Sequence, residues 1–477
     1  MGQEIETSHF SDADFAAFDE RLRAETALLH AWFRAAAFSG CGDVGGFELE
    51  AWLVDARCRP APINVAFLAR LDDPRVVAEL ARFNIELNSA PEPLHGPALG
   101  SLLTELETIS AHCQRTAVEF GAHMLTIGIL PTLQEDDLGP GSMSDLRRYR
   151  ALNEQVLRQR GGRALRLEIH GREHLRTEQR DVMLEAATTS FQIHLKVAPE
   201  RAARYYNLAQ VLSAPMVAVS ANSPFLFGHD LWDETRIPLF EQAVAAGGYA
   251  AVAHGPLRRV SFGSGYVRES LFECFQENLE HFPVLLPIAS REPPEALAHL
   301  RLHNGTVWRW NRPLIGFDSD GTPHLRIEHR VVPAGPTPVD AIANAALFFG
   351  LMQFLGTGAV PPSQLLPFPV ARDNFYAAAR DGLDAHIEWT GGRRGAVRTL
   401  LLDELLPMAR RGLEQLALDA ADIERFLGII QGRLTNACNG AAWQRAYVAR
   451  YGRDWEGLTL AYQERAATGR PVHEWGL

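Results

Sequence analysis

Acidic side chains recur at alternate positions in three short apolar segments of the chain. Glu48 and Glu50 alternate with apolar residues in GFELEAWLVD. Glu86 does the same in FNIELN, and Glu328 in LRIEHRV. Because side chains two residues apart share one face of a β-strand, each segment predicts a strand with an apolar face and an acidic face. Any one of these carboxylates alone is typical of a solvated surface, but carboxylates on neighbouring strands repel one another unless a cation lies between them.

Two segments add nitrogen and amide groups to the same kind of face. The strand-like TSFQIHLKV places Gln192, His194 and Lys196 opposite its apolar residues, and LRIEHRV places Arg326 and Arg330 beside its glutamate. Oxygen-rich sites with a supplementary histidine or amide suit Mg²⁺ or Mn²⁺, which usually bind together with substrate phosphates. Arginine suits phosphate or carboxylate groups because its planar donors bind two oxygens at once. The pattern indicates a site for a metal ion and an anionic substrate.

These side chains need a sheet whose other face is covered, and the rest of the chain supplies helices for that purpose. Apolar spacing predicts helices at 12–37, 71–83, 99–120, 146–158 and 199–212 and a buried helix at 339–355, and from residue 362 the pattern is mostly helical. Alternation predicts strands in GGFELEAWLVD, FNIELN, HMLTIGILP, ALRLEIHG, TTSFQIHLKV, GTVWRWNRPLIGF and PHLRIEHRVV. Without regular glycine fingerprints of βαβ units, this order predicts an α+β fold with helices on one sheet face.

Composition and charge narrow the class of protein. The chain has 477 residues, 47% hydrophobic and 22% charged, which is typical of a globular enzyme and excludes a disordered or collagen-like chain. A net charge of -12 argues against a general nucleic-acid-binding protein. The five cysteines are scattered without a C-x-x-C pair, a pattern that fits a reducing compartment and offers no zinc site or disulfide framework.

The chain also carries features that bear on its organisation and location. The N-terminus is acidic and polar and does not resemble a signal peptide, and the apolar stretch 341–360 is interpreted as a core helix rather than a membrane span. We therefore expect a cytoplasmic protein. Because no low-complexity linker interrupts the sequence, we expect a single catalytic domain over 1–477, with core motifs at about 44–386 and a helical C-terminal extension at about 362–477.

Taken in order, these segments resemble the glutamate–cysteine ligase type 2 family and the related carboxylate–amine ligases of the glutamine-synthetase-like superfamily. GFELEAWLVD resembles the G-x-E-x-E opening strand of the family, and IELNSAPEPL its second acidic strand. TSFQIHLKV resembles the strand with polar metal ligands, and LRIEHRVVPAG the late R-x-E-x-R strand. The A-N-S-P-F segment at 221–225 and ARDNFYAAARDGLDA match further landmarks, so the resemblance runs from about residue 44 to 386.

The resemblance implies a glutamine-synthetase-like fold, a curved and mainly antiparallel sheet with helices on one face and the metal and ATP site on the other. It implies an ATP-dependent ligase that uses Mg²⁺ or Mn²⁺ and forms a γ-glutamyl or similar amide bond through an acyl phosphate. Its small-molecule substrates would be glutamate or a similar carboxylate and an amine or amino acid, with no nucleic acid or membrane as partner. The implied metal ligands are Glu48, Glu50, Glu86, Gln192, His194 and Glu328.

The remaining candidate residues are proposed to take part in catalysis, to bind ATP phosphates or to bind the substrates. Arg330 and Glu328 are the implied catalytic residues, with Arg330 stabilising charge on the transferred phosphoryl group. Arg326, Arg330 and Lys196 are candidates for binding ATP phosphates, and a solvated surface position is the alternative for Arg326 and for Lys196. The candidate substrate-binding residues are Arg268, which could instead form a salt bridge within a loop, and Asn222 and Ser223, which could instead form a turn.

Two departures and two alternative functions stay open. Gln192-x-His194 stands where family members often carry His-x-His or Gln-x-Asn, and residues 161–185 and the helical tail have no confident counterpart, which leaves the amine acceptor open. The same carboxylates would suit a metal-dependent phosphohydrolase or kinase, because metal and phosphate geometry does not choose the acceptor. A degenerate family member that senses a nucleotide or metabolite is the other alternative.

Overall fold

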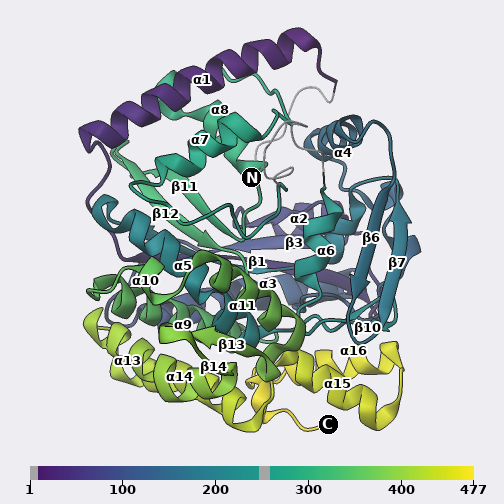
Figure 1. The fold of residues 1–477 in the computed structure, drawn as a ribbon. Coiled ribbons are helices and arrows are strands. Elements are labelled where there is room, and N and C mark those ends of the chain that lie inside the picture. Colours follow the sequence, from purple (N-terminus) through teal and green to yellow (C-terminus); the bar gives the residue numbers. More distant parts are fainter. Residues whose placement is uncertain (1–8, 246–257) are drawn as a thin grey trace.

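A central antiparallel sheet organises the protein, as seen in the computed structural model (Figure 1). The structure describes residues 9–245 and 258–477, so the first eight residues, on which part of the N-terminal interpretation rests, lie outside the described residues. The sheet is eight-stranded in the order β11-β12-β8-β1-β3-β2, with β4 and β5 also paired to β1. Its strands are β1 (Val44–Asp55), β2 (Val76–Ala78), β3 (Asn84–Asn88), β4 (Glu92–Pro93), β5 (Ala122–Leu125), β8 (Phe191–Val197), β11 (Asn311–Phe317) and β12 (Pro323–His329).

The helices follow the strands in an irregular order and lie on both sides of the sheet (Figure 1). They are α1 (Asp12–Ala35), α2 (Asn64–Leu71), α3 (Ala98–Glu119), α4 (Arg147–Gln159), α5 (Pro199–Ser220), α6 (Arg236–Ala243), α7 (Phe272–His281), α8 (Ala298–Gly305), α9 (Pro338–Thr357), α10 (Pro362–Leu365), α11 (Phe368–Asp381), α12 (Val397–Leu400), α13 (Leu406–Gln415), α14 (Ala420–Asn436), α15 (Gly440–Tyr451) and α16 (Trp455–Ala466). Helix α5 packs on β8, β11 and β12, and α9 packs on α3, α5 and β8. In Figure 1 these three helices lie below the sheet, while α1, α7 and α8 lie above it.

Helix α9 is the apolar stretch that the sequence placed in the core. It begins after Thr337, whose side chain accepts a hydrogen bond from the Asp340 amide, and Pro338 occupies the first turn, where its missing N–H costs nothing. By length and composition this helix could cross a membrane, but 83% of its most apolar window is buried inside the protein. The core-helix interpretation is therefore confirmed, and the helix supports the sheet from below.

Small two-stranded sheets flank the central one. They are formed by β6 (Leu165–His170) with β7 (His174–Gln179), β9 (Phe225–Leu226) with β10 (His229–Asp230), and β13 (His386–Trp389) with β14 (Arg393–Ala396). The β6–β7 hairpin packs against α6 at the right of Figure 1. The β13–β14 hairpin interrupts the otherwise helical C-terminal region, and its turn contains Gly391 and Gly392, both with positive φ angles.

The predicted α+β fold and the main strands are confirmed, but one predicted helix is wrong. Residues 71–83 form no helix: α2 ends at Leu71, and Asp72 adopts a left-handed conformation. Pro74 disfavours helical dihedrals at the residue before it, so the chain turns there. Val76–Ala78 then pairs with β3, because tertiary pairing outweighs the helical spacing of its apolar residues. The predicted helix at 199–212 also continues further, to Ser220.

Candidate active site

The register of the central strands brings the predicted acidic and polar side chains onto one face. Glu50 on β1 lies directly opposite Glu86 on β3, and Glu48 lies opposite Gln192 on β8. Glu328 on β12 lies opposite His194 on β8. Directly paired residues of antiparallel strands point to the same side, and so do residues two apart on one strand. Four carboxylates from three strands therefore share the face opposite the one on which α9 packs.

Three of these side chains converge on one point. Glu48 Oε1 lies 3.3 Å from His194 Nε2, and Glu328 Oε1 lies 3.9 Å from the same nitrogen. One donor atom from each of the three residues lies within 4.8 Å of the others. The His194 side chain is buried, yet neither of its ring nitrogens has a hydrogen-bond partner among the residues that the structure describes. Because buried polar atoms are nearly always satisfied, this unpartnered imidazole between two carboxylates fits a bound cation.

Arg312 holds the Glu328 carboxylate in place from the neighbouring strand β11. Its Nε donates to Glu328 Oε2 at 2.6 Å, and its Nη2 donates to Oε1 at 2.9 Å. Burial alone would raise the pKa of Glu328, but the charges of Arg312 and then Arg330 outweigh it and hold that pKa far below its usual range. Glu328 is therefore a permanently ionised and oriented carboxylate.

The other carboxylate of the three-donor group is also ionised. Burial would raise the pKa of Glu48, but the adjacent His194 outweighs this effect and lowers the pKa to about 2. An ionised pair of carboxylates on either side of an imidazole offers two hard oxygen ligands and one nitrogen ligand. The group of Glu48, His194 and Glu328 therefore suits a divalent cation.

A second group of carboxylates lies beside the first. This group contains Glu50 and Glu86, together with Glu79, which follows β2, and Glu185, which lies on the short 3₁₀ helix Met183–Ala187. Burial, and then the charge of Glu86, raises the pKa of Glu50 to about 7. Burial and neighbouring carboxylates likewise raise the pKa of Glu79 to about 7 and that of Glu185 to about 8, and they raise the pKa of Glu86 well above its ordinary value. The raised pKa values mean that this group attracts protons or cations.

Gln192 connects the second acidic group with Arg330. Its Nε2 donates to Glu50 Oε1 at 3.0 Å, and its Oε1 accepts from Arg330 Nη1 at 2.5 Å. The oxygen is the atom through which an amide binds a metal, and here it accepts from a guanidinium instead. Arg330 also lies 3.3 Å from Glu328 Oε2. The structure thus brings Gln192 and Arg330 to the site and places them as a bridge between the two acidic groups.

Two of the residues proposed for phosphate binding, Lys196 and Arg326, lie opposite each other but differ in their partners. Lys196 pairs with Arg326 in the register of β8 and β12. The Lys196 Nζ is bound by both carboxylate oxygens of Asp318, at 2.8 and 2.9 Å. No ion pair of Arg326 occurs among the described residues, and its Nε is buried without a hydrogen-bond partner. Arg326 therefore has the free donors that a phosphate group needs.

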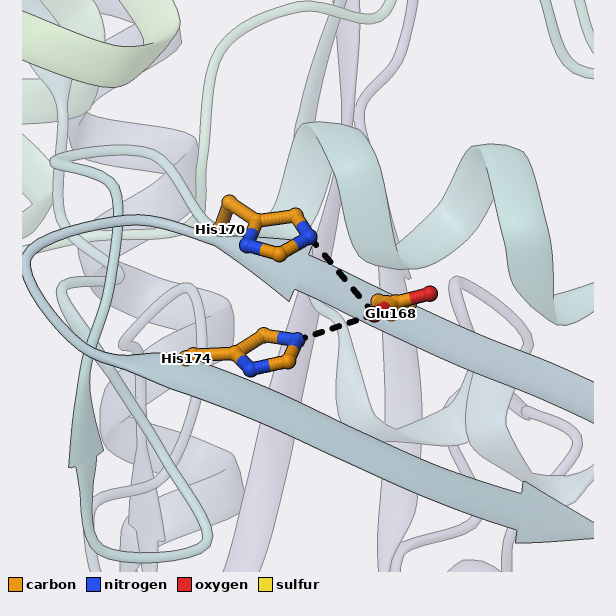
Figure 2. A group of neighbouring side chains, drawn as sticks. All are labelled: Glu168, His170 and His174. Carbon is orange, nitrogen blue, oxygen red and sulfur yellow. Dashed lines mark hydrogen bonds and ion pairs between the residues drawn. The ribbon is translucent and has the colours of Figure 1, made fainter.

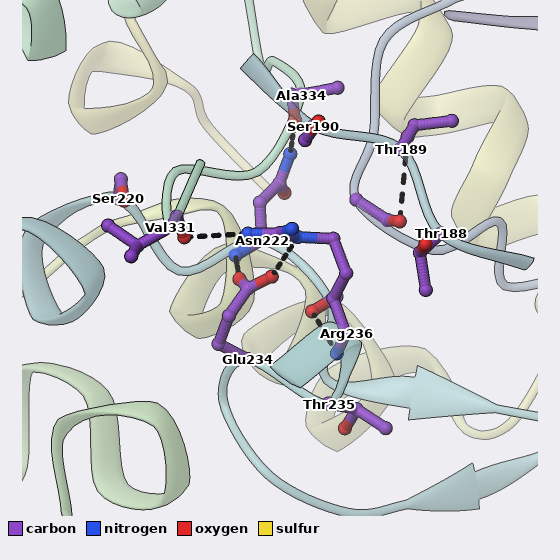
Figure 3. Close-up of polar contacts among 12 residues, drawn as sticks. Thr188, Thr189, Ser190, Ser220, Asn222, Glu234, Thr235, Arg236, Val331 and Ala334 are labelled. Carbon is purple, nitrogen blue, oxygen red and sulfur yellow. Dashed lines mark hydrogen bonds and ion pairs between the residues drawn. The ribbon is translucent and has the colours of Figure 1, made fainter. Parts of the chain in front are cut away.

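Asn222 and Ser223 are fully buried, and Figure 3 shows the hydrogen bonds around Asn222. The Asn222 side chain donates to the carbonyl oxygen of Ala334 at 2.8 Å, and its backbone N–H donates to Glu234 at 2.9 Å. The Ser223 hydroxyl oxygen accepts a hydrogen bond from the backbone N–H of Arg236. These contacts hold a turn in place, and the structure does not bring either residue into the acidic face.

Arg236, at the start of α6, supports the end of β12 from this network. Its Nε donates to Glu234 at 3.0 Å, and its Nη2 donates to the carbonyl oxygen of Val331 at 2.6 Å (Figure 3). Both Nη atoms also lie 3.3 Å from the carbonyl oxygen of Arg330. Arg236 thereby fixes the backbone from which the Arg330 side chain extends.

Arg268 stands apart from the residues named above. Its side chain is exposed, and its backbone N–H donates to the Glu273 carboxylate at 3.0 Å. This contact joins the loop backbone to a side chain of α7, and no ion pair of the Arg268 guanidinium occurs among the described residues, so the salt bridge of the alternative interpretation is not seen. The structure does not bring Arg268 together with the acidic face.

Comparison with known proteins settles the family. A family model described as glutamate-cysteine ligase family 2 matches residues 44–465, which is most of the chain. The chain belongs to glutamate–cysteine ligase family 2. Its members are ATP-dependent ligases that form a carbon–nitrogen bond, so this chain is an enzyme of that class. The match includes the helical C-terminal region almost to its end.

Solved structures with a similar fold are consistent with this family. One is a glutamate–cysteine ligase from Francisella tularensis in complex with AMP, with a TM-score of 0.52 and 11% identity over 92% of this chain and 90% of that one. Another is a bifunctional glutathione synthetase from Pasteurella multocida, with a TM-score of 0.51 and 12% identity over 93% of this chain. This chain spans 55% of the length of that protein. The likeness shows that this chain shares the fold of these ligases. Comparison with curated protein sequences gives no match.

Several residues of this family site escaped the sequence analysis. Arg312 lies in a segment correctly predicted as a strand, but its neighbours Asn311 and Pro313 give no apolar alternation that would mark its face. Glu79 and Glu185 lie in short or irregular segments, where no periodicity shows which way a side chain points. Arg236 acts through a contact between segments that are 94 residues apart, which no local pattern indicates.

Proposed function

We propose that the protein is an ATP- and Mg²⁺-dependent carboxylate–amine ligase that forms a γ-glutamyl amide through an acyl-phosphate intermediate. The observation that carries the proposal is the buried, unpartnered imidazole of His194 between the ionised carboxylates of Glu48 and Glu328. Family membership supports the reaction class. The AMP bound to the Francisella tularensis enzyme supports a nucleotide site in this fold.

The donor set suits divalent cations at two neighbouring positions. We assign Glu48, His194 and Glu328 to one position, and Glu50, Glu79 and Glu86 to a second, where the raised pKa values mark uncompensated negative charge. Bound there, Mg²⁺ would neutralise phosphate oxygens and favour transfer of the phosphoryl group. We assign Gln192 to the orientation of Arg330 rather than to a metal, because its oxygen accepts from that guanidinium.

Phosphoryl transfer needs positioning and charge neutralisation more than covalent catalysis. Arg330 is held by Gln192 and lies 3.3 Å from Glu328, so its guanidinium is oriented at the edge of the acidic face. In this position it stabilises the charge that spreads over the transferred group. Arg326 binds a phosphate of ATP through the donors that no described ion pair uses. Glu328, oriented by Arg312, keeps the charge at this end of the site fixed.

The remaining assignments extend the same proposal. Asn222 and Ser223 position the backbone behind the site instead of touching substrate, because both are fully buried. Lys196 acts with Asp318 as a neutral pair, and Arg268 stays a candidate for the substrate carboxylate. We also propose that the chain works in the cytoplasm as one catalytic unit, which the unpaired state of all five cysteines and the burial of α9 support.

Product analysis tests the function. Purified protein is incubated with ATP, Mg²⁺ and glutamate, with and without a panel of amines and amino acids, and ADP, phosphate and new amides are quantified. We expect one acceptor to yield an amide with equal amounts of ADP and phosphate. Glu48→Gln should abolish this turnover, whereas Glu107→Gln, an exposed glutamate on α3, should not. Phosphate release that no acceptor changes would favour a phosphohydrolase, and nucleotide binding without turnover would favour a sensor.

A further inference from the structure

A second cluster of potential metal ligands lies on the β6–β7 hairpin, outside the central sheet. Glu168 and His170 occupy alternate positions of β6, and His174 pairs directly with His170 at the closed end of the hairpin. All three side chains therefore lie on one face of the hairpin, and all three are exposed. They fall in the part of the chain, residues 161–185, for which the family resemblance offered no counterpart.

The donor atoms of these side chains point toward one another (Figure 2). His174 Nε2 lies 3.0 Å from Glu168 Oε1, and His170 Nε2 lies 3.6 Å from the same oxygen. The two imidazole rings stack with their centroids 4.1 Å apart and an angle of 7° between their planes, so at least one of these exposed rings must rotate before both nitrogens hold the same ion. One donor atom from each residue lies within 4.8 Å of the other two.

These spacings suit a tetrahedral metal ion. Zinc lies about 2.0–2.2 Å from imidazole nitrogen or carboxylate oxygen, so two of its tetrahedral ligands are about 3.4 Å apart. The observed separations of 3.0 and 3.6 Å lie on either side of that value. We infer that Glu168, His170 and His174 form a binding site for Zn²⁺ or a similar transition-metal ion. Three protein ligands leave the fourth position open to water or an external ligand.

The hairpin backbone that carries the three ligands is anchored by α6 and by the segment that precedes it, which contains Leu231 and Trp232. The Gln242 side chain on α6 accepts from the Glu168 N–H at 3.0 Å and donates to the Glu168 carbonyl oxygen at 3.2 Å. The indole of Trp232 donates to the His170 carbonyl oxygen at 2.8 Å. At the turn, a Cβ on Gly171 would lie 2.6 Å from the Leu231 backbone, so only glycine fits there. Ligands on a fixed backbone lose less entropy when they bind an ion.

The chemistry of this cluster differs from that of the acidic face. Two imidazoles and one carboxylate favour zinc and neighbouring transition metals, whereas Mg²⁺ prefers oxygen ligands. Arg176 lies opposite Glu168 in the register, and Arg166 is paired with Glu178 at 3.0 Å. An excess of Mg²⁺ should therefore occupy the acidic face while leaving the hairpin cluster available to Zn²⁺.

Zinc titration of the full chain in excess Mg²⁺ tests the site. Bound Zn²⁺ is measured by equilibrium dialysis for the wild type, for His170→Ala/His174→Ala and for Glu168→Gln. We expect the double variant to bind one Zn²⁺ fewer than the wild type, and Glu168→Gln to bind it about 10- to 100-fold more weakly. The matched control is His95→Ala/His386→Ala, which removes two exposed histidines elsewhere and should bind Zn²⁺ like the wild type.

Thermal unfolding with and without Zn²⁺ gives a second readout. An ion that binds only the folded hairpin raises the unfolding midpoint, so Zn²⁺ should stabilise the wild type and the control but stabilise the double variant less. Unchanged zinc stoichiometry and affinity in both hairpin variants would overturn the inference. Glu168→Gln keeps both histidines and the hairpin contacts of Gln242, so it decides the question if the double variant does not fold. Ligase activity is not part of this test, which stands apart from the proposed function.

Discussion

Replacing each of two buried arginines by lysine separates a structural role from a catalytic one. Arg312 and Arg330 both lie beside Glu328, but Arg312 forms two short parallel bonds with it, at 2.6 and 2.9 Å. Arg330 approaches the same carboxylate only to 3.3 Å and makes its short contact with Gln192. We therefore expect Arg312→Lys to reduce stability and Arg330→Lys to reduce turnover.

The contacts set the size of each effect. Lysine at position 312 can keep one of the two charge-assisted bonds and loses the bond to the Gly305 carbonyl oxygen. Because a hydrogen bond to a charged group contributes roughly 1.5–3 kcal/mol, Arg312→Lys should lower the free energy of unfolding by about 2–4 kcal/mol. Lysine at position 330 can keep the contact with Gln192, so the expected loss of stability is about 1 kcal/mol or less. Loss of the planar fork should lower kcat by about 10²- to 10³-fold.

Both quantities are measured on the same preparations. Unfolding midpoints in urea, together with kcat and KM for ATP at saturating Mg²⁺, are compared for the wild type and the two variants. We expect Arg330→Lys to change kcat more than KM, because an interaction made mainly in the transition state appears in kcat. If Arg330→Lys were as unstable as Arg312→Lys and kept near-wild-type kcat, Arg330 would be a structural residue and the catalytic assignment would be wrong.

Three further predictions concern the metal and phosphate positions. His194→Ala should raise the Mg²⁺ concentration for half-maximal turnover at least about tenfold, because it removes one of three convergent donors. An unchanged Mg²⁺ dependence would exclude Glu48, His194 and Glu328 as the metal site. Without divalent cations, Glu50→Gln should raise the unfolding midpoint at pH 8. The folded-state pKa of Glu50 is raised from 4.5 to about 7, so its ionisation destabilises the fold as the pH rises through that range, and the gain should vanish below pH 4.5. Arg326→Gln should raise KM for ATP about 10- to 100-fold. Lys196→Gln should change KM by less than about threefold, because Lys196 is already paired with Asp318. Equal effects of the two substitutions would contradict the assignment of Arg326.

Strand alternation was enough to predict which carboxylates share a face. The period of two along β1 places Glu48 and Glu50 on one side whatever the register, and the apolar residues between them show which side is buried. The same reasoning holds for His194 on β8 and Glu328 on β12. Alternation alone does not choose the neighbouring strand, so the close approach of Glu48, His194 and Glu328 depended on a register that only the structure shows.

Long-range contacts and irregular segments explain what the sequence did not reveal. Gln192 was a metal candidate by type, but its partners come from two other strands, and they determine that its oxygen accepts from Arg330. Val76–Ala78 has the apolar spacing of a helix and becomes a strand because β3 offers an unpaired edge. The convergence of His170 and His174 required the hairpin register, which a glycine turn in the sequence suggests but does not define.

Isotope transfer from the carboxylate substrate tests the central claim most directly. Glutamate labelled with ¹⁸O in its side-chain carboxylate is incubated with ATP, Mg²⁺, the amine acceptor and the enzyme, and the released phosphate is analysed by mass spectrometry. If the carboxylate is activated as an acyl phosphate, attack of the amine leaves one carboxylate oxygen on phosphate, so each phosphate released in amide formation should carry one ¹⁸O. Phosphate that contains no label from glutamate, and instead takes its oxygen from ¹⁸O-labelled water in a parallel reaction, would show direct hydrolysis of ATP and contradict the account.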